Sequence, residues 1–263
     1  MSGPILIFDS GVGGLSVAAA IRRRLPTAAL AYVCDNAMLP YGTKPDAWLV
    51  ARIVAVCREA VAACRPAALV VACNTASTLA LEALRASLTI PVVGTVPAIK
   101  PAAALSHSGH IALLATSATV NRPYTLGLIR DFAGGCRVHR LAADALVVQA
   151  ERHLAGEPLD LAAIADGLAP LWEDPELDTV VLGCTHFPLL RDALNRAAPR
   201  PVTWVDSGEA IARRVAQVVP HPRVTEGPGP AWVTAEAPTL TAALAGVGFA
   251  APQLLLLAAD APH

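Results

Sequence analysis

The stretch Leu69-Val70-Val71-Ala72-Cys73-Asn74-Thr75 decides the fold. Its first four residues form a short apolar run that predicts a buried strand, and the polar residues after it mark the end of that strand. An Ala-rich stretch follows and predicts a helix over Thr78–Ser87. A strand that leads directly into a helix is the repeating unit of α/β proteins with parallel sheets.

The same alternation of short strands and longer helices runs through the chain and predicts an α/β protein with parallel strands. The predicted strands are Ile5–Phe8, Ala31–Cys34, Leu69–Ala72, Val92–Val93, Ile111–Ala115, Val180–Gly183 and Thr203–Val205. The predicted helices include Ala47–Cys64, Thr78–Ser87 and Leu161–Leu171.

Two halves of this map are alike, because each contains two strands that end in polar residues. These ends are Asp9-Ser10 and Cys73-Asn74-Thr75 in the first half, and Thr116-Ser117 and Cys184-Thr185-His186 in the second. Ligands of open α/β sheets bind beyond the carboxyl ends of the strands, so both halves would present these groups to a ligand. If the halves face each other, the two cysteines converge.

We therefore expect two similar, doubly wound parallel-sheet domains. The boundary is placed near the Pro-rich segment Pro97–Pro101, and the last stretch, from about Ser207, is expected to return to the first half. The first domain would comprise residues 1–97 plus 208–263, with Asp9 and Cys73. The second would comprise residues 98–207, with Cys184 and His186.

Composition excludes several classes of protein. The 263 residues are 54% hydrophobic, and the mean hydropathy is +0.51, yet no apolar run approaches the ~18 residues of a membrane-spanning helix. No secretory signal is seen at the N-terminus. The net charge is −1, and no basic block exceeds Arg22-Arg23-Arg24. We expect a cytoplasmic protein whose partner is a small-molecule substrate. Binding to nucleic acid or to a membrane is not expected, and a homodimer is possible.

The six cysteines form no CxxC pair and have no histidine at zinc-finger spacing, so no metal site is predicted. Cys57 and Cys64 lie seven residues apart on one face of a predicted helix and are expected to be ordinary buried residues. Cys34 and Cys136 are interpreted in the same way. The two cysteines at strand ends are the exceptions.

Cys73 and Cys184 have the placement of a proton-transfer pair. A thiol at a helix N-terminus can have its pKa lowered, because the helix dipole favours the anion by about 0.3–1 kcal/mol. One cysteine could be a thiolate while the other, closer to a carboxylate such as Asp9, stays a thiol. One residue would then remove a proton from one face of a carbon while the other delivers a proton to the opposite face. Asp9 and His186 are the expected partners of the two thiols.

No cofactor is expected. Gly11-Val12-Gly13-Gly14 resembles a phosphate loop, but Ser16 replaces the third glycine of the dinucleotide motif and Asp9 would repel a pyrophosphate. Pyridoxal phosphate is disfavoured because Lys44 and Lys100 both precede prolines in predicted loops and neither lies at a strand end.

Five motifs, in order along the chain, together resemble glutamate racemase, of the aspartate/glutamate racemase superfamily. They are Phe8-Asp9-Ser10-Gly11-Val12-Gly13-Gly14-Leu15, Pro40-Tyr41-Gly42-Thr43-Lys44, Ala72-Cys73-Asn74-Thr75-Ala76-Ser77, Pro91-Val92-Val93-Gly94-Thr95-Val96-Pro97-Ala98-Ile99-Lys100-Pro101 and Leu182-Gly183-Cys184-Thr185-His186-Phe187-Pro188-Leu189-Leu190. The resemblance runs from about Ile5 to Ser207 and is looser in the tail.

The resemblance implies two α/β domains with the active site between them, no cofactor, and interconversion of L- and D-glutamate for peptidoglycan synthesis. Cys73 would take the α-proton of D-glutamate and Cys184 that of L-glutamate, assisted by Asp9 and His186. The implied substrate-binding residues are Ser10, Tyr41, Gly42, Asn74, Thr75 and Thr185, with Thr116 and Thr119 as weaker candidates and Pro40 in the same turn as Tyr41.

One stretch departs from the family pattern. Relatives commonly carry Cys-Pro ahead of a short apolar run that ends in Glu, whereas this chain has Ala143-Asp144 there. Glu151 is the positional match for that glutamate, and its part in the site is an open question. An exposed helix acid is the alternative interpretation of Glu151.

Three other functions compete with glutamate racemisation. The nearest is racemisation of a related acidic amino acid such as aspartate, which would use the same cysteines. A cysteine hydrolase could use Cys184 with His186, although it leaves Cys73 unexplained. The third is a non-catalytic module that binds a small molecule.

Overall fold

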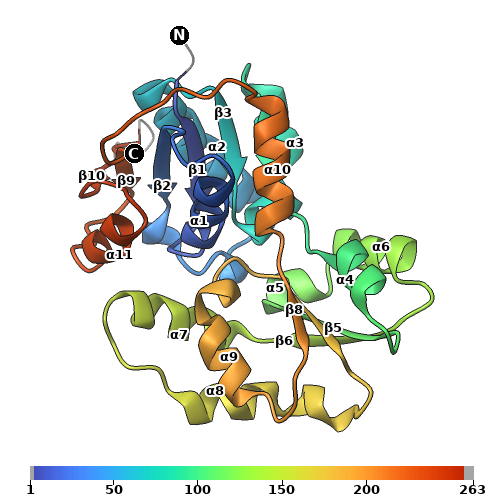
Figure 1. Ribbon diagram of the computed structural model, residues 1–263. Helices are drawn as coiled ribbons and strands as arrows, with labels where there is room; N and C mark the ends of the chain where they lie inside the picture. The colour runs from blue at the N-terminus through green and yellow to red at the C-terminus, as the bar shows by residue number, and fades with distance from the viewer. Residues whose placement is uncertain (1–2, 258–263) are drawn as a thin grey trace. The chain divides into compact units, whose positions relative to one another are not determined.

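A computed structural model describes residues 3–257, which form two compact units. Residues 3–95 and 208–257 make unit 1, and residues 96–207 make unit 2. Each unit is built on its own parallel sheet with helices on both faces (Figure 1). The predicted class, two doubly wound α/β domains, is confirmed.

The sheet of unit 1 has the strand order β10-β9-β2-β1-β3-β4, and its paired strands are parallel. The strands are β1 (Ile5–Asp9), β2 (Leu30–Cys34), β3 (Ala68–Val71), β4 (Val92–Gly94), β9 (Ala231–Val233) and β10 (Gln253–Leu254). The last two come from the end of the chain, and β9 pairs with β2.

Helices cover both faces of this sheet. They are α1 (Gly14–Arg24), α2 (Asp46–Cys64), α3 (Asn74–Ser87), α10 (Gly208–Val218) and α11 (Leu240–Gly246), with short 3-10 helices η1 (Asn36–Met38) and η2 (Tyr41–Thr43). Helix α2 packs beside α3, and α1 packs beside α10 (Figure 1). Leu6 and Phe8 of β1 pack in one core cluster with Leu49 and Ile53 of α2. Since strand side chains alternate, the central strand is buried on both faces.

The sheet of unit 2 has the order β6-β5-β7-β8, again with parallel pairs. Its strands are β5 (His110–Ala115), β6 (Arg137–Ala142), β7 (Thr179–Leu182) and β8 (Thr203–Val205). Its helices are α4 (Ile99–Leu105), α5 (Ser117–Val120), α6 (Pro123–Phe132), α7 (Asp144–Leu154), α8 (Leu161–Leu168), η3 (Ala169–Glu173), η4 (Phe187–Leu190) and α9 (Arg191–Ala197).

Alternate residues of β5 serve two separate cores. Ala112 and Leu114 pack in the cluster that includes residues of α7, α8 and α9. Ile111 and Leu113 pack in the cluster that includes Ile99 of α4 and residues of α5 and α6. Burial on both faces explains why β5 is a continuous apolar run after His110.

Most predicted elements lie within one or two residues of the observed ones, but three strands were missed. Strand β6 is mostly exposed or half-buried, so its sequence RVHRLA lacks the apolar run of a central strand. Strands β9 and β10 are only three and two residues long. The predicted helix Leu161–Leu171 was too long: α8 ends at Leu168 and a 3-10 helix follows, in which Pro170 lacks the N–H that an α-helix requires.

The strand order positions two polar strand ends side by side in each unit. In unit 1 the chain leaves β1, forms β2 on one side of it, and returns to place β3 on the other side. Unit 2 repeats this arrangement with β5, β6 and β7. The point where the strand order reverses is the usual ligand-binding position of such sheets. It lies between the ends of β1 and β3 in unit 1, and between those of β5 and β7 in unit 2.

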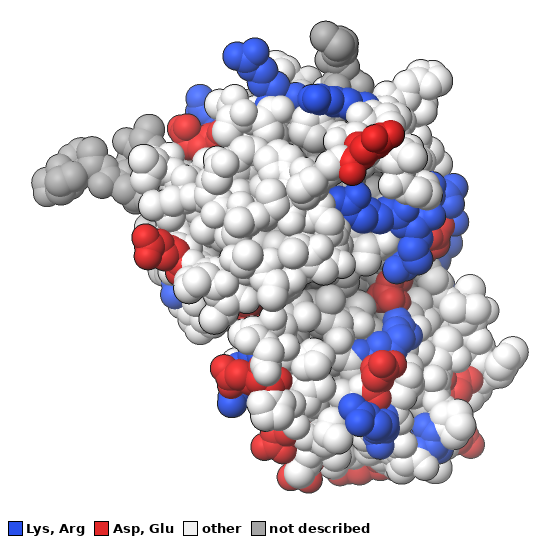
Figure 2. All heavy atoms as spheres, turned by 60° about the vertical axis from the view of Figure 1, so that its left-hand side comes forward, with Lys and Arg blue, Asp and Glu red and all other residues white. Residues whose placement is uncertain are grey.

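On the face that Figure 2 shows, acidic and basic side chains are scattered among wide uncharged areas, and several basic side chains gather near the right-hand edge. None of the helices among residues 3–257 is both long enough and apolar enough to cross a membrane.

Asp178 ties the start of β7 to the loop that precedes β5, and its removal should destabilise unit 2. Its carboxylate accepts hydrogen bonds from the hydroxyls of Ser106 (2.7 Å) and Thr179 (2.8 Å) and from the backbone N–H groups of His107 (2.8 Å) and Ser108 (2.9 Å). Burial alone would raise the pKa of Asp178, but these hydrogen bonds outweigh it, so the pKa lies well below its usual range.

We expect Asp178→Asn to lower the free energy of unfolding by about 1–3 kcal/mol at pH 7, the typical value of charged hydrogen bonds. Because folding lowers the pKa of the Asp178 carboxyl, this group stabilises the fold fully at pH values above its unfolded-state pKa of about 3.9. The stabilisation is lost as the pH falls from there through the lower pKa of the folded state. The difference in melting temperature between variant and wild type should therefore shrink between pH 7 and pH 3. An equal difference at both pH values would contradict this account.

Candidate functional site

The first candidate centre lies at the carboxyl ends of β1 and β3 in unit 1. Cys73 directly precedes α3 and occupies its N-cap position. Its Sγ lies 3.6 Å from Oγ of Ser10, which follows β1. The parallel pairing of β1 with β3 produces this contact. Phe8 and Val71 are register partners, and Ser10 and Cys73 each lie two residues further along the chain. Cys73 is 7% exposed and Ser10 is 4% exposed.

Asp9 lies fully buried behind Ser10. Its Oδ1 accepts a hydrogen bond from the N–H of Gly11 (2.8 Å) and lies 3.5 Å from Oγ of Ser10. Gly14, at the start of α1, packs so closely that an added Cβ would stand 2.9 Å from Cβ of Asp9 and 2.8 Å from the hydroxyl of Tyr32. This close packing explains a glycine of the loop that resembled a phosphate-binding motif.

Asn74 and Thr75 begin α3 beside the thiol and are 5% and 6% exposed. Among the described residues, Asn74 Oδ1 is one of few buried side-chain oxygens that accept no hydrogen bond. A buried acceptor without a partner costs about 1–3 kcal/mol. An N–H donor from a ligand would remove that cost, and the ammonium group of an amino acid carries such donors.

Tyr41 faces the interior and does not present its hydroxyl to a ligand. The hydroxyl donates to Oδ2 of Asp35 (2.8 Å), and burial followed by the charge of Asp35 raises the pKa of Tyr41 well above its usual value. Arg52 donates to both oxygens of Asp35 (2.9 and 3.1 Å), and the hydroxyl of Thr234 donates as well (2.6 Å). This network anchors the turn through the buried Tyr41, while Pro40 and Gly42 on either side of it are exposed.

The second centre lies at the end of β7 in unit 2. Cys184 Sγ lies 3.6 Å from Nδ1 of His186, and Nε2 of His186 lies 2.6 Å from Oε1 of Glu151 in α7. The three residues form a chain from thiol through imidazole to carboxylate. Cys184 and His186 are 8% and 3% exposed, and the side chain of Glu151 is 20% exposed.

The helix N-terminus considered for the two thiols is present directly after Cys73 but not directly after Cys184. A turn follows it, and then the 3-10 helix η4, which contains Pro188. Cys73 therefore has a long helix to stabilise a thiolate, whereas the neighbour available to Cys184 is His186.

Threonine hydroxyls accompany the second centre. Thr185 follows the cysteine and is 6% exposed. Thr116 follows β5, the strand that pairs with β7, and its hydroxyl donates to that of Thr119 (3.1 Å). The structure thus brings Thr116 and Thr119 together at the end of the strand next to that of Cys184.

The remaining cysteines have environments unlike those of the strand-end pair. Burial raises the pKa of Cys57 well above its usual value and that of Cys64 to about 12. Both therefore stay protonated at neutral pH and are poor bases. Cys34 is buried within β2, and Cys136 is half-buried before β6.

Comparisons with known proteins decide the family. The profile of the Asp/Glu/Hydantoin racemase family matches residues 15–215. The chain belongs to this family. A glutamate racemase of Shewanella sp. (strain MR-7) is 54% identical over 215 residues, which cover 82% of this chain and 79% of the relative.

Solved racemase structures of this family have the same fold. The structure of Escherichia coli glutamate racemase, in complex with L-glutamate and the activator UDP-MurNAc-Ala, matches with a TM-score of 0.92 and 44% identity over 97% of this chain and 98% of that one. A glutamate racemase isoform of Bacillus anthracis matches with a TM-score of 0.81 and 28% identity over 97% of both chains. Membership makes this chain a racemase, and hence an isomerase.

The sequence of this racemase left the role of Glu151 undecided and did not reveal that of Asp35 and Arg52. Glu151 contacts the imidazole of His186 through its carboxylate. Asp35 and Arg52 were missed as anchors of the Tyr41 turn. Asp35 follows a strand directly, a position that could have drawn attention to it.

Glu151 should control racemisation through His186. Glu151→Gln removes the charge that holds the imidazole, and we expect kcat/KM to fall about 10- to 100-fold, by analogy with losses of charged groups that orient a functional histidine. Because a racemisation has an equilibrium constant of one, kcat/KM must fall equally for both enantiomers. The pH dependence of kcat should also change, which a purely structural role would not produce.

Glu157→Gln is the matched control, since Glu157 is an exposed acid of the same unit that pairs with Arg152 (2.6 Å). Equal activity and equal pH profiles for Glu151→Gln and Glu157→Gln would show that Glu151 is only a surface acid.

Proposed function

We propose that this racemase interconverts L- and D-glutamate by proton transfer at the α-carbon between two cysteines, without a cofactor. One observation carries the proposal: Cys73 and Cys184 follow corresponding strands, β3 and β7, of two similar sheets. The hydroxyl of Ser10, which borders the Asp9 carboxylate, lies beside Cys73, and the imidazole of His186 lies beside Cys184. Sequence identities of 44–54% to glutamate racemases favour glutamate as the substrate.

The reaction requires one thiolate and one thiol, on opposite faces of the α-carbon. The thiolate takes the α-proton, the C–H electron pair passes into the carboxylate as a planar enediolate, and the thiol donates its proton to the other face. No net proton is gained or lost by substrate and enzyme together. Each turnover exchanges the protonation states of the cysteines, with Cys73 acting as base on D-glutamate and Cys184 on L-glutamate.

The proton partners of the two thiols differ in kind. Ser10 lies between Cys73 and the Asp9 carboxylate, and His186 lies between Cys184 and the Glu151 carboxylate. In our proposal Asp9 and His186 set the protonation states of their neighbouring thiols. Ser10 connects Asp9 with Cys73, and Glu151 acts as a positioning residue through His186.

Substrate binding is assigned to the polar groups around these strand ends. Asn74 would accept a hydrogen bond from the substrate ammonium, since its buried Oδ1 accepts none from the part of the chain that the structure describes. Hydroxyls and backbone N–H groups would bind the two carboxylates. We assign this role to Ser10, Gly42, Thr75, Thr116, Thr119 and Thr185, with Tyr41 and Pro40 shaping the turn.

The biological role that fits this activity is the supply of D-glutamate for peptidoglycan in the cytoplasm. The E. coli relative was solved with a nucleotide-sugar activator, so activity should be measured with and without UDP-MurNAc-Ala. A rise in rate on its addition would extend that regulation to this chain.

The test is deuterium exchange at the α-carbon of each enantiomer in deuterated water, with purified protein and no added cofactor. Wild-type protein should lose optical rotation while deuterium enters the product. Cys73→Ala and Cys184→Ala should both lower kcat/KM by at least about 100-fold, the lower range of acid–base contributions. Cys136→Ala, which removes a half-buried thiol of unit 2, is the matched control and should keep full activity.

The variants also test which cysteine serves which enantiomer. Cys184→Ala should still exchange the α-proton of D-glutamate without inversion but not that of L-glutamate, and Cys73→Ala should show the opposite preference. Exchange with aspartate in place of glutamate would indicate the aspartate-type racemase. No exchange with either substrate would overturn the racemase proposal and favour a hydrolase that uses Cys184 and His186 or a binding module without turnover.

A further inference from the structure

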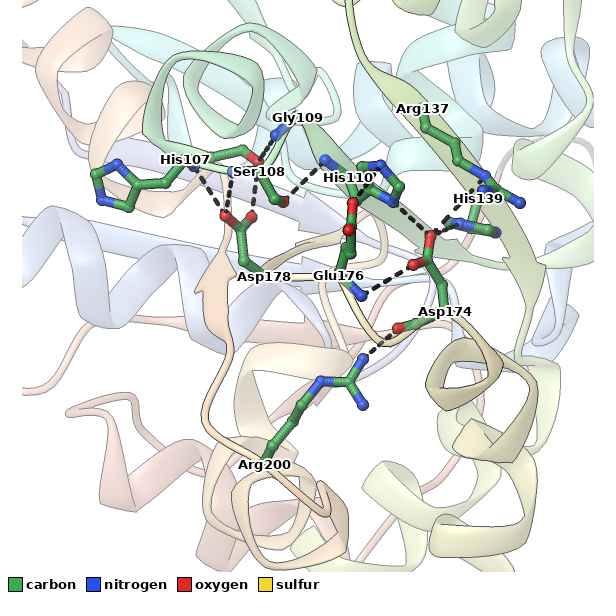
Figure 3. Close-up of polar contacts among 11 residues, drawn as sticks. His107, Ser108, Gly109, His110, Arg137, His139, Asp174, Glu176, Asp178 and Arg200 are labelled. Atoms are coloured by element: carbon green, nitrogen blue, oxygen red, sulfur yellow. Dashed lines mark hydrogen bonds and ion pairs between the residues drawn. The ribbon is translucent and has the colours of Figure 1, made fainter.

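A second group of ionisable side chains lies at the amino end of the unit 2 sheet (Figure 3). His110 is the first residue of β5, His139 lies in β6, and Asp174 follows η3. One ligand atom from each residue lies within 4.8 Å of the others. The mechanism proposed above uses none of these residues.

The fold assembles this group from three separate segments. His110 and Arg137 are register partners on the adjacent strands β5 and β6, so His139 projects on the same face, one diagonal step further. Asp174 Oδ2 lies 2.8 Å from Nδ1 of His110 and 2.6 Å from Nε2 of His139. Both imidazoles are thus directed at one carboxylate oxygen.

We propose that His110 Nδ1, His139 Nε2 and Asp174 Oδ2 bind a divalent transition cation of the zinc type. Two imidazoles and one carboxylate, with a position left for water, form a known ligand set of Zn²⁺. Tetrahedral zinc with ligands at about 2.0 Å separates them by about 3.3 Å. Asp174 Oδ2 must therefore move away from the two ring nitrogens by roughly 0.5–0.7 Å, and the two nitrogens already lie within 4.8 Å of each other.

Contacts around the three residues orient them as metal ligands. Oε2 of Glu176 lies 3.2 Å from Nε2 of His110, the ring nitrogen opposite the proposed ligand atom. A carboxylate in that position fixes the tautomer of a metal-binding histidine. The backbone N–H of Glu176 also donates to Oδ1 of Asp174 (3.0 Å), which directs Oδ2 at the two rings. Arg200 donates to the backbone carbonyl of Asp174.

The site is accessible to a cation from solvent. The side chains of His110 and His139 are 20% and 28% exposed. Arg137 is the competing positive charge, with Nε 3.9 Å from Asp174 Oδ2. Its side chain is 66% exposed, so it can turn into solvent when a cation binds.

The place of these three residues in the sheet indicates that a bound cation would have a structural role. His110 begins β5 and Thr116 follows its other end, so the cluster and the polar strand end lie about 20 Å apart along the strand. A bound cation would join β5, β6 and the segment between η3 and β7, which otherwise meet through hydrogen bonds. It would stabilise unit 2 without touching the cysteines.

The test is titration of metal-free full-length protein with Zn²⁺, followed by calorimetry and by the shift in melting temperature. Because thiols also bind zinc, all proteins carry Cys73→Ser and Cys184→Ser. We expect one zinc per chain and a raised melting temperature. His139→Ala should weaken binding at least tenfold and abolish the thermal shift. His107→Ala is the matched control, because His107 is exposed and Figure 3 shows its ring directed away from Asp174.

Asp174→Asn serves as the second variant where His139→Ala does not fold without metal, as judged by circular dichroism. Undiminished zinc binding by a folded variant of either kind would overturn the proposal, as would no binding by the reference protein. Racemisation is measured separately on the chain with both cysteines. A failure of racemase activity therefore leaves the metal result unaffected, and the reverse also holds.

Discussion

The rest of the structure depends on the parallel pairing of the first and third strands in each unit. β1 pairs with β3, and β5 pairs with β7, in registers that place the carboxyl ends of the paired strands side by side. Parallel neighbours require a crossover through a helix, so these ends are also where turns and helix starts gather. Cys73 meets Ser10 because of this pairing, and Cys184 follows the strand beside that of Thr116. A shift of one residue in either register would turn these side chains to the other face.

Burial of polar groups at these ends must be offset by hydrogen bonds, and each unit does so differently. Asp9 is fully buried, and the N–H of Gly11 donates to its carboxylate. Glu151 is partly exposed and lies against the imidazole of His186. Charged groups are costly to bury without partners, so these contacts stabilise the site as well as orient it. The same contacts connect each thiol to a carboxylate, through Ser10 in unit 1 and through His186 in unit 2.

Sequence predicted the parts of the fold that depend on local pattern. Central strands buried on both faces are continuous apolar runs, so β1, β3, β5 and β7 could be recognised, and with them the polar residues that follow. Edge strand β6 is polar and half exposed and gave no such signal. Contacts between distant segments were equally hidden. Asp35 with Arg52, Glu151 with His186, and the histidines of β5 and β6 with Asp174 meet only through the fold.

A racemisation interconverts substrates of equal free energy, and in the mechanism that we propose each of the two topologically similar units supplies one base. Equal topology does not make the two bases equal. Cys73 has a 14-residue helix behind it and a serine beside it, whereas Cys184 has an imidazole beside it and a short 3-10 helix after it. Helix dipole and imidazole stabilise a thiolate by different means, and a two-base reaction needs one thiolate and one thiol. The surroundings of the two thiols therefore differ although the topology of the two units is the same, and the proposed reaction depends on that difference.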